Sequence, residues 1–243
     1  MAPNPEPGAR GNPLETLRQI ERLRHERVAP APLDPGVLLL RRWQALRLSR
    51  TYADLLEHPR YQSACRFFLD DLYGARDFSQ RDHDLTQMYE FSRRVFPEQS
   101  IRPLARTVEL HFMTQSLDAR LLDALVNRLG VTDTITPALY AEAYRLCDNY
   151  VERVQQIELI GEIGQMLDGL VKLPLVGAAV ALARGPAARA GYGELTEFLE
   201  RGYNAFKHMR GSTFFLSTVR QRELRILDKL FANDPDPFGF SLE

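Results

Sequence analysis

The densest group of chemically versatile side chains lies in one short stretch, from Asp70 to Asp84. This stretch holds five Asp, two Arg, one Tyr and one His. Arg side chains bind anions, and a helix N-terminus adds backbone N–H groups that have no partner within the helix. The stretch therefore predicts a site for an anionic ligand at a helix–turn–helix corner. Its candidate ligand-binding residues are Tyr73, Arg76, Asp77, Arg81 and Asp82.

The same residue types also fit ordinary helix capping. Gly74 would end one helix, and Ser79 with Asp82 forms a capping box that would start the next. Asp77, Asp82 and Asp84 would then lie near the positive end of that helix dipole. Capping alone explains every residue type in the corner, so the structural interpretation is favoured over the ligand site.

A second constellation would carry metal chemistry. His83 and Asp84 are adjacent, His58 lies upstream, and Asp118 or Asp148 would supply a distant acid. This order resembles that of the HD phosphohydrolases, which are all-α and metal-dependent. The resemblance implies that His58, His83 and Asp84 hold a divalent metal that activates water. In those enzymes the His–Asp pair usually follows an apolar helical run, whereas here it opens a helix.

Other signatures of catalysis or cofactor binding are missing from the sequence. It contains no Glu-x-x-His pair for a di-iron centre, no nucleophile elbow, no phosphate-binding loop and no dinucleotide fingerprint. Haem ligation would fall to a lone histidine such as His111 or His208. Cys65 and Cys147 are far apart and form no disulfide framework or metal knuckle, which predicts a reducing, cytoplasmic location.

Two strings carry a further resemblance. The string RFFLDDLYGARDFSQRDHDL covers residues 66–85 and has the form FFLxDLYGxRDFxxRD, and ELTEFLERGYNAFKHMRGSTFFL covers residues 194–216. Both are similar to the signature of a bacterial all-helical family without an established activity. The resemblance implies a bacterial, cytoplasmic, helical protein and no particular substrate. The excess of Arg over Lys, 28 against 3, is typical of a GC-rich bacterial genome.

The elements that would position these residues are all helical. Apolar residues recur at helical spacing, and Asn12-Pro13, Asp34-Pro35 and Thr136-Pro137 are typical of helix starts. No segment alternates as a strand would. We predict an all-α fold, an irregular multi-helix bundle of about eight or nine helices. By residue number, the expected helices are 13–28, 35–56, 61–72, 80–96, 101–129, 137–171, 173–190, 194–209 and 212–231.

The longest predicted helix, 137–171, is expected at the centre of the bundle. Gly161 and Gly164 near its apolar stripe indicate close helix contact or a bend. The organisation predicted around it is a flexible N-terminal tail (1–12), a single helical domain (13–232) and a C-terminal tail (233–243).

The length of the apolar stretches and the charge of the chain limit the classes of partner that the protein can bind. The most apolar stretch, Leu170–Ala183, contains Lys172 and Pro174 and is shorter than the roughly 20 residues of a membrane span, which favours a buried core helix. The net charge of −1 leaves no footprint for nucleic acid. Residues 1–66 carry a charge of +4 and residues 132–168 carry −5, so these parts would dock within the fold or across a homodimer.

Aromatic side chains at helical spacing complete the picture. These side chains are typical of core packing. Alternatively, they and the small-residue helix 177–190 would border an apolar cavity between helices. These aromatic residues are Tyr140, Tyr144, Phe198, Tyr203, Phe206, Phe214 and Phe215. The sequence thus predicts a protein that binds a small molecule or a protein partner, at the polar corner or in an interhelical apolar pocket. The alternative is an HD-like hydrolase or a haem or metal enzyme. The residues identify no cofactor.

Overall fold

The computed structural model describes residue 28 and residues 32–74, 77–95 and 98–239. No strand occurs in these ranges, and the predicted all-α fold is confirmed. The predicted N-terminal tail and nearly all of the predicted helix 13–28 lie outside the described residues, as does Arg76.

Ten α-helices occur within the described ranges. They are α2 (Pro35–Thr51), α3 (Ala53–Glu57), α4 (Gln62–Phe67), α5 (Ser79–Val95), α6 (Glu98–Asp123), α7 (Pro137–Cys147), α8 (Tyr150–Leu170), α9 (Pro174–Arg189), α10 (Gly193–Met209) and α11 (Thr213–Phe231). Single π-helical turns, Phe68–Leu72 and Ala124–Arg128, extend α4 and α6.

Two of the predicted helix starts have the expected cap. The Asp34 carboxylate accepts hydrogen bonds from the backbone N–H of Gly36 and Val37, at 2.8 and 3.2 Å. The Thr136 hydroxyl accepts one from Leu139 N at 3.2 Å, just before Pro137 opens α7. Both caps satisfy N–H groups that the first helical turn leaves without a carbonyl partner.

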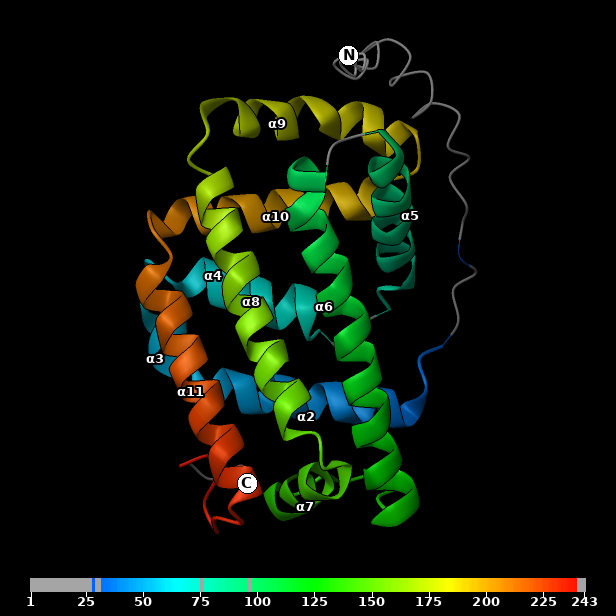
Figure 1. Ribbon diagram of the computed structural model, residues 1–243, viewed down its shortest axis with the longest axis vertical. Coiled ribbons are helices and arrows are strands. Elements are labelled where there is room, and N and C mark those ends of the chain that lie inside the picture. The colour runs from blue at the N-terminus through cyan, green and yellow to red at the C-terminus, as the bar shows by residue number, and fades with distance from the viewer. Residues whose placement is uncertain (1–27, 29–31, 75–76, 96–97, 240–243) are drawn as a thin grey trace, which may run out of the picture.

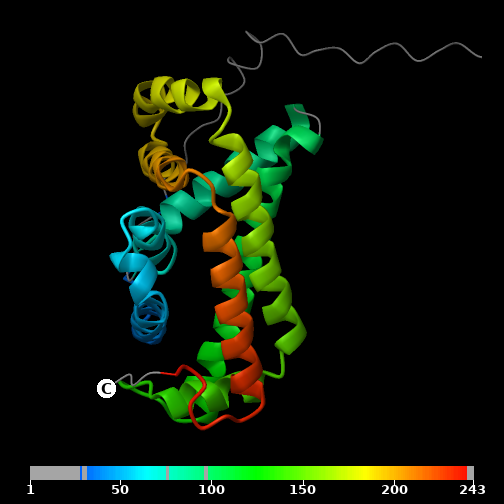
Figure 2. The ribbon, with the colours of Figure 1, turned by 90° about the vertical axis from the view of Figure 1, so that its left-hand side faces the viewer.

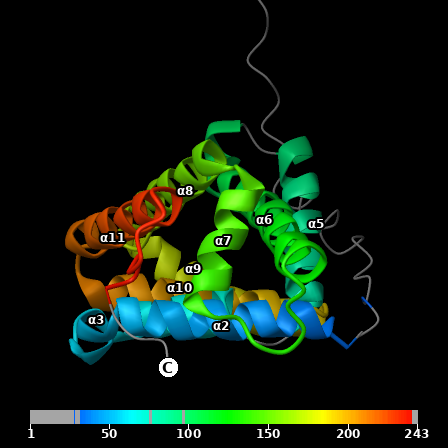
Figure 3. The same ribbon diagram turned by 90° about the horizontal axis from the view of Figure 1, so that it is seen from below.

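The helices form two layers, with α9 and α10 at one end of the molecule. Helices α6, α8 and α11 run along the long axis, while α2, α9 and α10 cross that direction (Figure 1). Turned by 90°, α2, α3 and α4 form a layer of their own beside α6, α8 and α11, with α9 and α10 at one end (Figure 2). Seen from the other end, α7 lies between these layers (Figure 3). The two layers and α7 therefore surround the middle of the molecule.

The prediction of one long central helix over 137–171 is wrong, because the helix ends after Cys147 and a second helix follows. Asp148 adopts the left-handed conformation at φ +47° and ends α7, and Asn149 begins α8. Short polar side chains tolerate this conformation better than most residues, since they bond locally to the backbone. The break turns the chain sharply between α7 and α8 (Figure 1).

Helix α9 is not the buried core helix that its composition predicts. Leu175 and Leu182 expose 81% and 78% of their surface. One face of the helix packs against α10. There Gly177 comes so close to Tyr203 that a Cβ atom added at Gly177 would lie 2.3 Å from the Tyr203 hydroxyl. Its apolar character therefore reflects small residues on the contact side and leucines that face outward. In the described ranges no single helix is long and apolar enough to cross a membrane; only α8 and α9 taken together are, and they are bent by 89°.

Most of the core is aromatic and aliphatic. The Trp43 and Tyr140 rings stack with centroids 3.8 Å apart, and Phe238 packs edge-on against Trp43 at 5.6 Å. Phe238 is buried although it belongs to the segment predicted as a C-terminal tail. Two more clusters centre on Phe206 with Phe215 and on Leu195.

Two glycines of α8, Gly161 and Gly164, are expected to respond oppositely to alanine. A Cβ at Gly164 would lie 2.5 Å from Leu216 Cδ2, whereas a Cβ at Gly161 would meet nothing within 4 Å. Gly164→Ala should destabilise the fold by about 1–3 kcal/mol through overpacking. Gly161→Ala should stabilise it by about 0.5–1 kcal/mol, since alanine is the better helix former. Urea unfolding of both variants checks this pair, and equal effects would contradict the close contact.

Candidate functional site

A cavity of about 90 Å³ lies between the two layers. It is bounded by α2, α4 and the π-turn after α4 on one side and by α6, α8 and α11 on the other, with α7 at one end. Half of the residues that line it are apolar and the other half carry charged or hydrogen-bonding groups, although most of the wall surface is apolar. The polar wall residues are Gln44, Arg47, Tyr52, Tyr73, Thr114, Asp118, Tyr140, Tyr144, Arg153, Gln156 and Glu223.

The first charged pair in the wall joins α2 to α11. One terminal nitrogen of Arg47, Nη1, donates to both carboxylate oxygens of Glu223, at 2.6 and 2.8 Å. The Tyr52 hydroxyl donates to the same carboxylate at 2.6 Å. Burial by itself would lower the pKa of Arg47, but the Glu223 carboxylate outweighs it and raises that pKa. Burial, followed by the charge of Glu223, raises the pKa of Tyr52, so this phenol stays a neutral donor.

The second charged pair joins α8 to α6. Arg153 Nη1 lies 3.5 Å from Asp118 Oδ1 and donates to Gln156 Oε1 at 3.0 Å, and Arg153 Nη2 donates to the Leu117 carbonyl at 3.1 Å. The Gln44 amide donates to the same Asp118 oxygen at 3.3 Å. Burial raises the pKa of Asp118, and Arg153 opposes that rise only in part. A carboxyl with a raised pKa in an enclosed cavity is a common feature of functional sites.

Three buried polar atoms of the wall have no hydrogen-bond partner within the part of the chain that the structure describes. They are Arg47 Nε, Arg153 Nε and Gln44 Oε1. The three residues as a whole expose 7%, 4% and 4% of their surface. A buried donor or acceptor without a partner costs about 1–3 kcal/mol, which a molecule in the cavity would recover only if these side chains turned toward it.

A π-helical turn brings Tyr73 to the cavity. The backbone N–H of Tyr73 donates to the Phe68 carbonyl at 3.1 Å, five residues earlier, which widens the last turn after α4. Phe68, Leu69 and Tyr73 all line the cavity as a result. Such turns occur often at functional sites. Cys65 lies in the same wall, and burial raises the pKa of its thiol to about 12, so it is no nucleophile at neutral pH.

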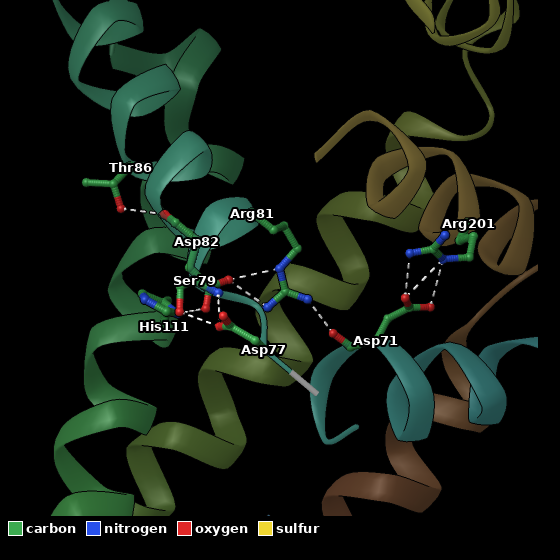
Figure 4. A network of polar contacts seen from close by, with 8 residues as sticks. All are labelled: Asp71, Asp77, Ser79, Arg81, Asp82, Thr86, His111 and Arg201. Atoms are coloured by element: carbon green, nitrogen blue, oxygen red, sulfur yellow. Dashed lines mark hydrogen bonds and ion pairs between the residues drawn. The ribbon is translucent and has the colours of Figure 1, made fainter. Parts of the chain in front are cut away.

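The predicted ligand-binding corner is divided by the fold. Tyr73 joins the cavity, whereas Asp77, Arg81 and Asp82 form a separate network shown in Figure 4. Asp77 accepts hydrogen bonds from the backbone N–H of Ser79, at 2.8 Å, and from its hydroxyl. Asp77 therefore caps α5, and the Asp82 side chain binds Arg81 instead of closing the predicted capping box.

Arg81 is occupied by protein groups. Its Nε and Nη2 donate to Asp82 Oδ1, at 2.9 and 2.6 Å, and its Nη1 donates to the Asp71 carbonyl. The guanidinium lies over the Phe78 and Phe198 rings, 4.1 and 4.7 Å from their centroids. Asp71, which is buried, pairs in turn with Arg201 at 2.8 Å (Figure 4). The corner therefore ties α5 and α10 to the turn after α4, as the capping interpretation of its residues favours.

The proposed metal ligands do not converge. His58 is exposed after α3, and its ring packs against Tyr61 with centroids 4.9 Å apart. His83 contacts Gln87 on α5 at 2.8 Å, while the neighbouring Asp84 is buried and accepts a hydrogen bond from Gln80 at 2.9 Å. Across the described ranges, no three His, Cys, Asp or Glu side chains are placed to hold a metal ion. Neighbouring positions on a helix point about 100° apart, which separates His83 from Asp84.

The two histidines considered for haem also have protein partners. His111 Nδ1 lies 3.7 Å from Asp82 Oδ2, and the His208 ring contacts the Pro59 carbonyl at 3.1 Å.

Comparison with known proteins identifies the family of this chain. The model of the family described as Domain of unknown function (DUF8198) matches residues 23–237. The chain belongs to the DUF8198 family. No curated protein and no solved structure matches it. The prediction of a family without an established activity is thus confirmed, and the DUF8198 match spans every residue of the cavity wall.

Sequence reasoning missed most of the cavity wall of this DUF8198 chain. In the predicted helix 137–171 it singled out Tyr140, Tyr144, Gly161 and Gly164, of which only the two tyrosines line the cavity. The buried face of α8 instead carries Arg153 and Gln156, followed by Leu159 and Ile163. An arginine and a glutamine spaced three apart on the face that continues as an apolar stripe were the available signal.

Proposed function

We propose that this DUF8198 protein binds a small polar molecule in the central cavity. The observation that carries the proposal is the combination of an enclosed volume of about 90 Å³ with buried wall atoms that lack partners among the described residues. Enclosed sites with a few convergent polar groups are the usual form of small-molecule sites. An engineered apolar cavity of about 150 Å³ holds benzene, so this one suits a ligand of about four non-hydrogen atoms.

Of the two binding sites that the sequence suggests, the interhelical pocket has the stronger support. Three of the five N–H groups of Arg81 are already used at the corner, and the Phe78 and Phe198 rings cover its guanidinium, so little of this residue is left for an anion. Half of the residues that line the interhelical pocket are polar although most of its wall surface is apolar, and Tyr140, Tyr144 and Phe215 belong to it.

A fragment titration followed by backbone amide NMR tests the proposal. Compounds of up to about six non-hydrogen atoms are added to the full chain. We expect saturable shifts that cluster around the cavity. Ile160→Phe, in the apolar wall, should abolish these shifts by filling the space, and Leu182→Phe, on the exposed face of α9, should leave them unchanged. Shifts that are absent from the wild type, or equal in both variants, would refute binding in the cavity.

A further inference from the structure

The charges in the cavity wall sum to zero. Arg47 and Arg153 are the two cations that line it, and Asp118 and Glu223 are the two anions. Each cation already faces a carboxylate, at 2.6 Å for Arg47 with Glu223 and 3.5 Å for Arg153 with Asp118. A charged ligand would therefore bring an uncompensated charge into a buried space, which is strongly unfavourable.

Three atoms of wall residues are unpartnered among the described residues but inaccessible from the cavity, so a ligand that recruits them needs both hydrogen-bonding roles and a small rotation of these side chains. Arg47 Nε and Arg153 Nε are donors and need an acceptor oxygen. Gln44 Oε1 is an acceptor and needs an N–H or O–H donor. Exchanging the two ends of the Gln44 amide would not remove this need, because its nitrogen already donates to Asp118 Oδ1 at 3.3 Å.

We infer that the cavity is specific for ligands of zero net charge that carry an acceptor oxygen together with an N–H or O–H donor, as a small primary amide does. This inference rests on the proposed function and adds the chemical class of the ligand. Balanced charge, two unpartnered donors and one unpartnered acceptor all lead to the same class. A water cluster would satisfy the same atoms, so binding has to be measured with a probe that displaces it.

Three probes of one shape test both the charge and the hydrogen-bonding roles. Acetamide, acetate and acetamidinium each have four non-hydrogen atoms; acetamide is neutral with an acceptor and a donor, acetate is an anion with acceptors only, and acetamidinium is a cation with donors only. They are titrated into the full chain by amide NMR at about pH 8, where acetate is fully ionised. We expect acetamide to bind about tenfold or more tightly than either ion, because only the amide leaves the buried charges balanced. Ile160→Phe should remove the shifts and so locate the binding.

Two mirror-image variants change the charge of the wall. Asp118→Asn leaves it at +1, so the affinity for acetate relative to acetamide should rise about tenfold. Arg153→Gln leaves it at −1 and should favour acetamidinium by a similar factor. If neither variant folds, the comparison of the three probes on the wild-type chain decides alone.

Equal or tighter binding of acetate or acetamidinium to the wild type would overturn the inference while leaving the proposed cavity site intact. Saturation by none of the three probes would also overturn it. In that case the wider fragment titration shows separately whether the cavity binds any small molecule.

Discussion

Glu223→Ala is expected to lower the free energy of unfolding by about 3–5 kcal/mol, because it leaves the buried Arg47 guanidinium without a counter-charge. The Arg47 side chain is only 8% exposed, and Glu223 is its ion-pair partner. The variant also removes the acceptor of the Tyr52 hydroxyl, which donates to Glu223 at 2.6 Å. Urea unfolding at neutral pH measures the loss.

A matched variant separates this effect from the loss of any surface ion pair. Glu158 pairs with Arg220, and both side chains are about half exposed, at 46% and 51%. Glu158→Ala should therefore cost less than about 1 kcal/mol. Replacing both buried partners, in Arg47→Met with Glu223→Leu, should recover most of the stability, since no buried charge remains. Equal costs for the two single alanine variants would mean that the buried pair is far better solvated than its surroundings indicate.

Arg81→Met is expected to cost about 3 kcal/mol, the second large effect in this protein. Methionine keeps apolar contact with the Phe78 and Phe198 rings but supplies none of the three donors that reach Asp82 and the Asp71 carbonyl. A carbonyl and a carboxylate at the junction of α5 with the turn after α4 would then lose their donors. Thermal or urea unfolding reports the change.

The control for Arg81 lies on the same helix. Arg93 forms a pair with Glu90 in which the two side chains are 56% and 46% exposed, and Arg93→Met should change stability by less than about 0.5 kcal/mol. Arg81→Lys keeps the charge but cannot reach all three acceptors, so an intermediate loss is expected. Acetamide should still bind in the cavity of the Arg81→Lys variant. Loss of acetamide binding without loss of stability would instead make the corner part of the ligand site.

The helix content was predictable because the decisive signals are local. The Asp34 and Thr136 caps act within three residues of their own position, and Pro59 and Pro137 end or start helices through their own ring. The break at Asp148 and Asn149 was missed, since apolar spacing continues past it. The two adjacent short polar residues were the local signal for this break, but our prediction followed the spacing of the apolar residues instead.

The corner and the metal hypothesis show where spacing misleads. Asp77, Arg81 and Asp82 are close in sequence, yet Asp77 accepts from Ser79, whereas Arg81 donates to Asp82 and to the Asp71 carbonyl. His83 and Asp84 are adjacent in sequence and differ in burial, with Asp84 only 1% exposed. Adjacency places two side chains on different faces of a helix, so a sequence motif alone does not show convergence.

The sequence by itself determined the all-α class and most helix boundaries, because those follow from interactions within a few residues. Only the tertiary structure decided where the cavity lies and which charges line it. Arg47 and Glu223 are 176 residues apart, and in sequence each is an ordinary charged residue on a helix. Whether such a residue faces water or a buried partner depends on how α2 and α11 pack. The free energy of burying a charge is a property of that packing, which no local pattern encodes.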